Sequence, residues 1–326
     1  MKTIERRIIG VGLSILLVYF LLYFAYWHDQ RATLASPPSS GFRNGLNSVA
    51  IKMVPRDGRI FVKASFDGID RLCILDTGSP TTHLPETSIP ATSVIAATLF
   101  HSRAEPYPGG VARPILTKTV KLIRIGDYEI THVPVRDYKF SPQDSKVGEV
   151  IPILGSDLFK NMRLTIDYAT STVTIDRPQT QSKPVGHDLS FNFDAPSRHY
   201  GLILLTGAIA DHPGPLLFDT GQGLGPLNVT DKDIARSMLD PEDAQEADRP
   251  QAILRANWRI ENVNFRSPAF TSPLVSGPFI GVIGIPVCYR YRVTIDYLHN
   301  TISFHRYGAN ECPPHLRRLQ EIFFND

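Results

Sequence analysis

The chain has 326 residues, of which 42% are hydrophobic and 20% are charged, and its formal net charge is only +2. A chain of this length is expected to form two domains or one domain with two lobes, with enough apolar residues for real cores. The basic residues are dispersed, which argues against a nucleic-acid-binding stripe. Proline and glycine separate many short alternating runs, so an all-β body is expected.

An uncharged run over residues 8–27 follows Lys2, Arg6 and Arg7 near the N-terminus. About 20 apolar residues in a helix span the hydrocarbon core of a bilayer, and basic residues before it favour a cytoplasmic N-terminus. A cleaved signal peptide is the alternative, but its apolar part is usually shorter and ends near small residues, whereas this run ends in aromatic residues. We therefore predict a cytoplasmic stub over 1–7, a transmembrane anchor over 8–27 and an extracytoplasmic body, which would be periplasmic in a bacterium.

The remaining chain is predicted to divide into four parts. Residues 28–50 are rich in Ser, Pro and Gly and are expected to form a tether. Two lobes follow, one over 51–180 and one over 201–326, and a linker over 181–200 joins them. Each lobe contains the short alternating runs that are typical of β-strands.

The first lobe contains Asp76-Thr77-Gly78-Ser79 directly after an apolar run. Residues 60–66 are predicted as a strand, Asp67-Gly68 as a hairpin turn and residues 72–75 as the returning strand. The triplet is therefore expected at the end of the second strand of a hairpin. A single Asp-Thr-Gly is a weak signal, so the surrounding pattern has to support it.

The second lobe repeats the same order of elements. Asp219-Thr220-Gly221-Gln222 follows a predicted hairpin over 201–218. Further shared motifs are Ile153-Leu154-Gly155 with Val282-Ile283-Gly284, and Thr165-Ile166-Asp167-Tyr168 with Thr294-Ile295-Asp296-Tyr297. The glycine precedes the later aspartate by the same distance in both lobes, which indicates a repeat of supersecondary units over about 60–177 and 201–306.

Two aspartates at equivalent ends of a repeated unit can hydrolyse a peptide bond if the fold brings them together. One carboxylate accepts a proton from water while a neutral carboxyl group polarises the carbonyl. Two adjacent carboxyl groups cannot both ionise easily, so the pair shares a proton and titrates as one unit. Gly78 and Gly221 would permit close approach of the main chain, and Thr77 and Thr220 provide hydroxyl groups for bonds to the opposite loop.

These motifs resemble those of the aspartic proteases, a clan that includes the single-domain retropepsins and the two-lobed pepsins. The resemblance covers most of 55–307, and the segment 153–159 particularly resembles bacterial retropepsin-like proteins. It implies two retropepsin-like β-barrel lobes in a pseudo-two-fold arrangement, with one active site between them. It also implies that Asp76 and Asp219 are the catalytic dyad. The residues that would support the active-site loops are Thr77, Gly78, Ser79, Thr220 and Gly221.

Members of this family also cover the active site with a mobile hairpin. The best candidate for such a flap is Tyr107-Pro108-Gly109-Gly110, because its glycines would allow hinge motion and Tyr107 would be able to reach the site. An ordinary surface turn is an equal alternative, since Pro-Gly-Gly is common turn chemistry.

The second lobe departs from the family pattern after its triplet. Gln222 replaces the small residue expected there, and its bulk would crowd the dyad or alter its proton affinity. The segment that follows is rich in glycine, unlike the segment after Ser79. Ile285-Pro286 also replaces Ser156-Asp157 after the glycine motif. These differences predict that the second lobe is the weaker partner.

The remaining polar residues are predicted to be structural. Asp167 and Asp296 lie between strands and suit turns. His83 is near the first triplet, but a catalytic role would duplicate the dyad. No Cys/His cluster in the sequence has zinc-site spacing, so neither a metal nor an organic cofactor is expected. Cys288 and Cys312 would be able to pair in an oxidising compartment, and the sequence leaves that question open.

The sequence therefore predicts a membrane-anchored aspartic endopeptidase that uses Asp76 and Asp219 to hydrolyse peptide bonds. Its expected partners are a peptide or protein substrate and, through the N-terminal helix, the membrane. One chain supplies both aspartates, so a monomer would suffice. Two alternatives remain open. In the first, the protein is a catalytically silent protease-like module that binds peptide or protein. In the second, Gln222 inactivates the second lobe, and the active protease is a homodimer that pairs two first lobes.

Overall fold

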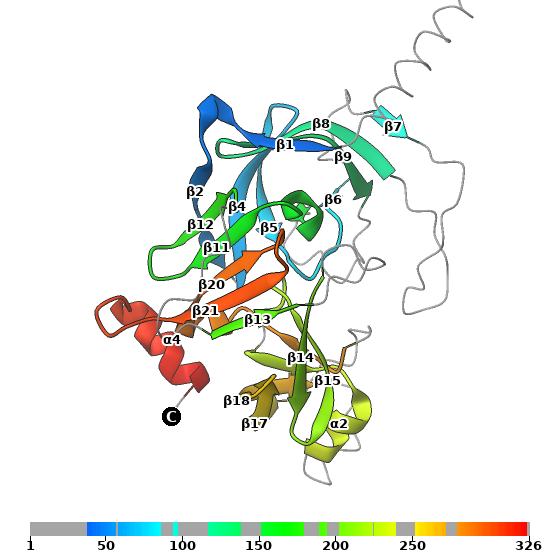
Figure 1. Ribbon diagram of the computed structural model, residues 1–326. Helices are drawn as coiled ribbons and strands as arrows, with labels where there is room; N and C mark the ends of the chain where they lie inside the picture. The colour runs from blue at the N-terminus through cyan, green and yellow to red at the C-terminus, as the bar shows by residue number, and fades with distance from the viewer. Residues whose placement is uncertain are drawn as a thin grey trace, which may run out of the picture.

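The computed structural model describes residues 38–56, 58–85, 94–96, 117–137, 151–178, 189–193, 202–223, 225–238, 252–271 and 279–324. These residues are mostly in β-strands, which form a nine-stranded sheet, a six-stranded sheet and a closed barrel of six strands (Figure 1). The predicted β body is confirmed at this level. Within the described ranges no helix is long and apolar enough to cross a membrane, and the predicted anchor over 8–27 lies outside them.

The first half forms the nine-stranded sheet around one hairpin. Strand β4 (Arg59–Phe66) turns at Asp67 and Gly68, both with positive φ, into β5 (Ile69–Leu75). The last three residues of β5 are buried, so the hairpin ends in the core. The other strands are β1 (Ser39–Phe42), β3 (Val54–Arg56), β6 (His83–Leu84), β7 (Val94–Ala96), β8 (Thr117–Ile125), β9 (Tyr128–Asp137) and β10 (Ile153–Leu154).

The second half forms the closed barrel. It also starts with a hairpin, β14 (Ile203–Ile209) and β15 (His212–Phe218), and the last three residues of β15 are buried. The barrel is completed by β16 (Leu227–Val229), β17 (Ala252–Ile260), β18 (Val263–Thr271) and β19 (Gly281–Ile283).

Strand pairing repeats between the halves. β10 runs parallel to β5 and antiparallel to β6, and β19 runs parallel to β15 and antiparallel to β16. The hairpins β8–β9 and β17–β18 occupy matching places next to β4 and β14. The internal repeat that the sequence predicts is therefore present in the hydrogen-bond topology.

The six-stranded sheet joins the two halves, because it takes strands from both. Its central pair, β11 and β20, is antiparallel and sets Thr165 opposite Thr294, with 3.1 Å between their Oγ1 atoms. These two threonines occupy the same position in the repeat. The strands are β2 (Ser48–Lys52), β11 (Arg163–Asp167), β12 (Thr172–Asp176), β13 (Leu189–Asn192), β20 (Tyr291–Asp296) and β21 (Thr301–Arg306).

Short helices follow several of these strands. Two of them, η4 (Ser156–Phe159) and α3 (Val287–Arg290), come soon after the two glycine motifs. The longest described helix is α4 (Pro314–Phe324), which buries Leu316 and Phe324 and donates a hydrogen bond of 2.7 Å from Gln320 Nε2 to the Tyr289 carbonyl. The remaining helices are η1 (Arg43–Gly45) and α2 (Lys232–Met238).

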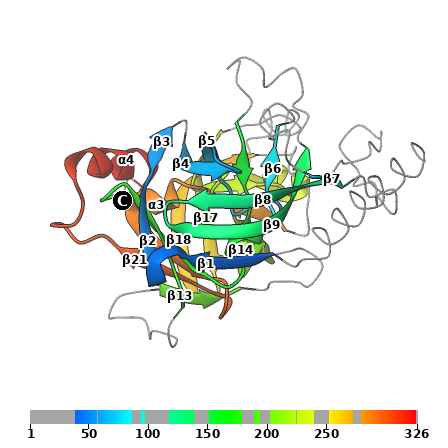
Figure 2. The same ribbon diagram turned by 90° about the horizontal axis from the view of Figure 1, so that it is seen from above.

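Two segments that the sequence suggested were connections contain strands. β1 lies within 28–50, the predicted tether, and pairs with β9 (Figure 2). β2 begins in the same segment, continues to Lys52 and pairs with β12 (Figure 1). β13 lies within 181–200, the predicted linker, and pairs with β21. The structure corrects both boundaries. A Ser-, Pro- and Gly-rich composition does not reveal short strands whose stability depends on pairing with a partner strand.

Candidate active site

The two triplets begin where the repeated hairpins end. Asp76 follows β5 and Asp219 follows β15, so each aspartate comes directly after three buried residues. The Asp76 N–H donates to the Leu154 carbonyl at 3.0 Å, and the Asp219 N–H donates to the Ile283 carbonyl at 3.0 Å. Each glycine motif therefore holds the triplet of its own half by the same backbone bond.

The main chain of the two loops continues in the same way. The N–H groups of Ser79 and Gln222 each donate to the carbonyl of the aspartate in their own loop, both at 3.3 Å. Their carbonyls accept bonds of 2.9 Å from the N–H groups of Ser156 and Ile285. The different side chains at 79 and 222 thus leave the loop backbone unchanged.

Thr77 and Thr220 connect the two loops reciprocally. The Thr77 N–H donates to Thr220 Oγ1 at 2.9 Å, and the Thr220 N–H donates to Thr77 Oγ1 at 3.1 Å. Each hydroxyl then donates across the interface, Thr77 to the Phe218 carbonyl at 3.1 Å and Thr220 to the Leu75 carbonyl at 2.7 Å. Both side chains are almost fully buried. These four bonds fix the loops against each other.

The glycines of the triplets leave room for the opposite carboxyl groups. A Cβ atom on Gly78 would lie 2.3 Å from Asp219 Cγ, and one on Gly221 would lie 2.6 Å from Asp76 Cγ. Backbone N–H groups point at the carboxylates as well. Gly78 and Ser79 donate to Asp76 Oδ1 at 2.9 and 3.0 Å, and Gly221 donates to Asp219 Oδ1 at 2.7 Å.

The two carboxyl groups interact directly, and this interaction changes their proton affinity. Burial raises the pKa of both groups, and the charge of Asp219 and a hydrogen bond with it raise the pKa of Asp76 further. For Asp219 the hydrogen bond from Asp76, the N–H groups of Gly221 and Gly78, and the charge of Arg59 act in the opposite direction. The two carboxyl groups therefore share one proton and titrate as a unit, because burial and their mutual repulsion oppose ionisation of both.

The other predicted site residues have different outcomes. The flap candidate with Tyr107, Gly109 and Gly110 lies outside the described residues. Asp167 and Asp296 stabilise turns, as predicted. In each, Oδ1 accepts hydrogen bonds from the backbone N–H groups two and three residues further along the chain.

Asp157 is a feature of the site region that sequence reasoning did not identify. Its carboxylate accepts bonds from the Thr82 N–H at 3.1 Å and from Thr82 Oγ1 at 2.8 Å. Burial raises the pKa of Asp157 to about 6. Thr82 Oγ1 also accepts a bond from the Gly155 N–H at 3.2 Å, so this pair connects the first loop to the first glycine motif. In the sequence, the signal that could have identified Asp157 was the difference between Ser156-Asp157 and Ile285-Pro286 after the two glycine motifs.

The three cysteines do not form the disulfide that the sequence left open. Cys73, Cys288 and Cys312 are all free thiols and buried, so the possible pairing of the last two does not occur in the structure. Within the described ranges, His, Cys, Asp and Glu side chains form no group that could hold a metal ion.

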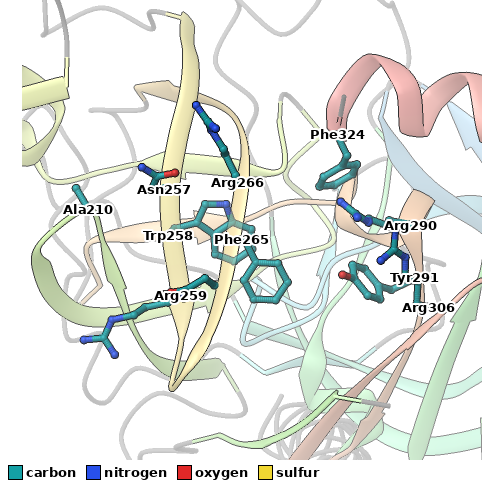
Figure 3. Close-up of a pocket in the computed structure, with 11 residues that line it drawn as sticks. Ala210, Asn257, Trp258, Arg259, Phe265, Arg266, Arg290, Tyr291, Arg306 and Phe324 are labelled. Carbon is teal, nitrogen blue, oxygen red and sulfur yellow. The ribbon is translucent and has the colours of Figure 1, made fainter. Parts of the chain in front are cut away.

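A cavity of about 490 Å³ lies elsewhere, between the β17–β18 hairpin and the β20–α4 region (Figure 3). Trp258 and Phe265 stack on one side of it, with ring centroids 4.3 Å apart, and Arg290 and Phe324 face them from the other side. Neither triplet contributes to its lining. The cavity therefore lacks the acid–base groups that hydrolysis needs and is not part of the candidate active site.

Comparison with known proteins does not assign the chain to a family. No protein-family model matches it, and a search of curated proteins gives no significant match. Function is therefore inferred from the geometry of the two loops.

Proposed function

We propose that this protein is an aspartic endopeptidase in which Asp76 and Asp219 activate a water molecule. The observation that carries the proposal is the reciprocal set of bonds by which Thr77 and Thr220 lock the two loops, so that the carboxyl groups meet. A turn aspartate would need neither a buried partner loop nor a second carboxyl group, since burying acids next to each other is costly. Such paired acids are typical of active sites.

The proposed reaction begins with ionised Asp219 and protonated Asp76. The water oxygen attacks the carbon of the scissile carbonyl while Asp219 accepts a proton from that water. Asp76 gives its own proton to the carbonyl oxygen. The resulting diol collapses when the amide nitrogen takes the proton from Asp219 and the C–N bond breaks. One hydroxyl returns a proton to Asp76, which restores the starting state. The N–H groups of Gly78, Ser79 and Gly221 hold the carboxylates in position throughout.

The finer architecture is part of the same proposal. The repeated pairing of β5 with β10 and of β15 with β19, together with the pairing of the equivalent residues Thr165 and Thr294, supports two retropepsin-like lobes in a pseudo-two-fold arrangement. We propose a monomeric site, because bonds within one chain join the two loops. The proposed anchor over 8–27 would place the site outside the cytoplasm.

Digestion of a peptide library by the full chain in mild detergent, over a pH series, tests this function. Asp76→Asn and Asp219→Asn should each lower cleavage by at least about 100-fold, because each variant loses one acid–base group. Asp70→Asn is the control, since Asp70 is exposed on β5 and remote from the opposite loop. Cleavage by both triplet variants at the parent rate would rule out the enzyme and leave a peptide-binding module. Activity of Asp219→Asn that depends on protein concentration would instead indicate a homodimer of first lobes.

A further inference from the structure

The turn between β3 and β4 of the first half lies directly against the second loop. A Cβ atom on Gly58 would lie 2.6 Å from the Gly223 carbonyl oxygen, and one on Gly223 would lie 2.5 Å from the Gly58 carbonyl oxygen. Gly58 also has φ +67, a conformation that L side chains rarely adopt. Both positions therefore need glycine for the two backbones to touch.

This contact brings a cation to the loop of Asp219. Arg59, the first residue of β4, donates from Nε to the Gly221 carbonyl at 3.1 Å. The N–H group of the same Gly221 donates to Asp219 Oδ1 at 2.7 Å. Arg59 thus fixes Gly221, and Gly221 in turn fixes the carboxyl group of Asp219. The positive charge of Arg59 also favours the ionised form of Asp219.

Within the described part of the chain, the position in the second half that is equivalent to Arg59 carries no cation. The registers Phe61–Ile74 in β4–β5 and Leu204–Leu217 in β14–β15 are equivalent. Two residues before Phe61 is Arg59, and two residues before Leu204 is Leu202. Leu202 is apolar, only 8% exposed, and belongs to a small buried hydrophobic cluster. The equivalent position in the second half therefore cannot stabilise a charge on Asp76.

The surroundings of the pair support the same asymmetry. Among the described residues, the positive charge of Arg59 lowers the pKa of Asp219, and the negative charge of Asp76 raises the pKa of the Tyr297 hydroxyl. Tyr297 is buried and neutral, because burial and then the charges of Asp76 and Asp157 raise its pKa. A neutral hydroxyl gives Asp76 no compensating charge.

We propose that Arg59 is a positioning residue that assigns the two roles of the dyad, keeping Asp219 ionised as the base and leaving the shared proton on Asp76 as the acid. The inference rests on the proposed function. In this proposal, Arg59 of the first half keeps Asp219 of the divergent second loop ionised and therefore able to act as a base.

Arg59→Gln tests this inference, because glutamine keeps an N–H donor for the Gly221 carbonyl but removes the charge. Arg59→Lys keeps the charge, and Arg71→Gln removes one charge elsewhere in the same hairpin, where Arg71 donates to the Asp70 carbonyl. The acid limb of kcat/KM against pH reports ionisation of the base. Arg59→Gln should move it upward by roughly half a pH unit, with less shift at high salt, since Arg59 is exposed and screened.

Carbon-13 NMR of aspartate carboxyl groups gives a readout that does not need cleavage, with Asp76→Asn and Asp219→Asn assigning the signals. In the parent and in Arg59→Lys the first ionisation should appear mainly on Asp219. In Arg59→Gln it should move upward and be shared more evenly with Asp76, while Arg71→Gln matches the parent. An unchanged first ionisation in Arg59→Gln, or an equal shift in Arg71→Gln, would overturn the role of Arg59. The proposed function fails separately, if both Asn variants still cleave peptide.

Discussion

The two Asp-Thr-Gly loops share their backbone and differ in what surrounds it. In both loops, the aspartate N–H donates to the carbonyl of the residue before the motif glycine. The carbonyl of the residue after the triplet accepts a bond of 2.9 Å from the N–H of the residue after that glycine. Around the first loop, polar side chains complete the packing, as when Ser156 Oγ donates to the Ser79 carbonyl at 3.2 Å and Asp157 binds Thr82. Around the second, different polar side chains take part, since Arg59 donates to the Gly221 carbonyl and Asn228 Nδ2 donates to the Gly225 carbonyl at 3.3 Å, and several glycines make close contacts.

Those contacts explain the glycines that made the second loop look weak. A Cβ atom on Gly225 would lie 2.5 Å from the Phe270 ring, and one on Gly284 would lie 2.4 Å from the Gly225 carbonyl oxygen. Together with the Gly58–Gly223 contact, they show a loop that is tightly packed through its main chain. The comparison teaches that the shared backbone bonds and the two threonine hydroxyls set the arrangement of the dyad, while the other side chains around the loops differ between the halves.

The largest effects are expected where the two loops touch. Gly78→Ala and Gly221→Ala would each push a methyl group into the opposite carboxyl group, at 2.3–2.5 Å and 2.6–2.7 Å from its atoms. We expect peptide cleavage to fall at least about 100-fold, because a small displacement of the dyad has large kinetic consequences. Stability should fall by about 1–3 kcal/mol.

Gly41→Ala is the matched control for these substitutions, because a Cβ atom there would meet its nearest neighbour, Arg177, at an ordinary 3.9 Å. Cleavage rates and denaturant unfolding of the three variants make the comparison. Wild-type activity in Gly78→Ala would mean that the carboxyl groups need not approach each other for function.

The threonine bonds should be equally important to both halves. Thr77→Val and Thr220→Val keep the side-chain shape but remove two bonds each and leave a buried carbonyl without its donor. Each should lower the free energy of unfolding by about 3 kcal/mol. The double variant should lose less than the sum, since the pair acts as one unit.

Urea unfolding measures these losses, with Thr170→Val as the control because Thr170 is exposed in a turn. Losses that differ strongly between Thr77→Val and Thr220→Val, or that add without coupling, would contradict a reciprocal lock between the halves.

Asp157, which lies only on the side of the first loop, should make stability depend on pH. Burial raises the pKa of Asp157 from its ordinary value of about 3.8 to about 6, so the folded state holds the proton more tightly than the unfolded state. The resulting stabilisation is complete below the unfolded pKa and is lost as pH rises through the folded pKa. Between pH 4 and pH 6 this loss amounts to about 2 kcal/mol.

Asp157→Asn should remove that part of the pH dependence. The raised pKa values of the dyad act in the same direction, but they are present in both proteins and cancel in the difference. Urea unfolding of parent and variant at several pH values gives the two curves. Parallel curves from pH 4 to pH 6 would show that Asp157 does not titrate in this range.

The local elements of the fold were predictable from the sequence, and the long-range contacts were not. The strands predicted over 60–66 and 72–75 form parts of β4 and β5, and the hairpin predicted over 201–218 contains β14 and β15. Alternation and turn chemistry are local signals, so the hairpins that carry the triplets could be identified. The equal spacing of the later motifs also pointed to equivalent positions in a repeat.

Arg59 shows why the rest could not be read in the same way. Arg59 contacts Gly221, which lies 162 positions away in the sequence. Neither the apolar pattern around Arg59 nor its sequence neighbours distinguish it from any other charged residue at the start of a strand. The glycines after Asp219 had a visible pattern, but its meaning lies in the Gly58 and Phe270 that they touch. Contacts of this kind depend on how the halves pack, which one sequence does not specify locally.

The smallest effect is expected at the residue that first suggested a defective second loop. The backbone at Gln222 donates from its N–H to the Asp219 carbonyl and accepts at its carbonyl from the Ile285 N–H. Ser79 makes the equivalent two bonds in the first loop, so this backbone arrangement accommodates a serine. Gln222→Ser should therefore change kcat/KM by less than about fivefold, which corresponds to under about 1 kcal/mol. The reverse exchange, Ser79→Gln, should cost more, because Ser79 Oγ donates to the Thr81 carbonyl at 2.8 Å. A rise of tenfold or more in Gln222→Ser would show instead that the glutamine side chain restrains the dyad.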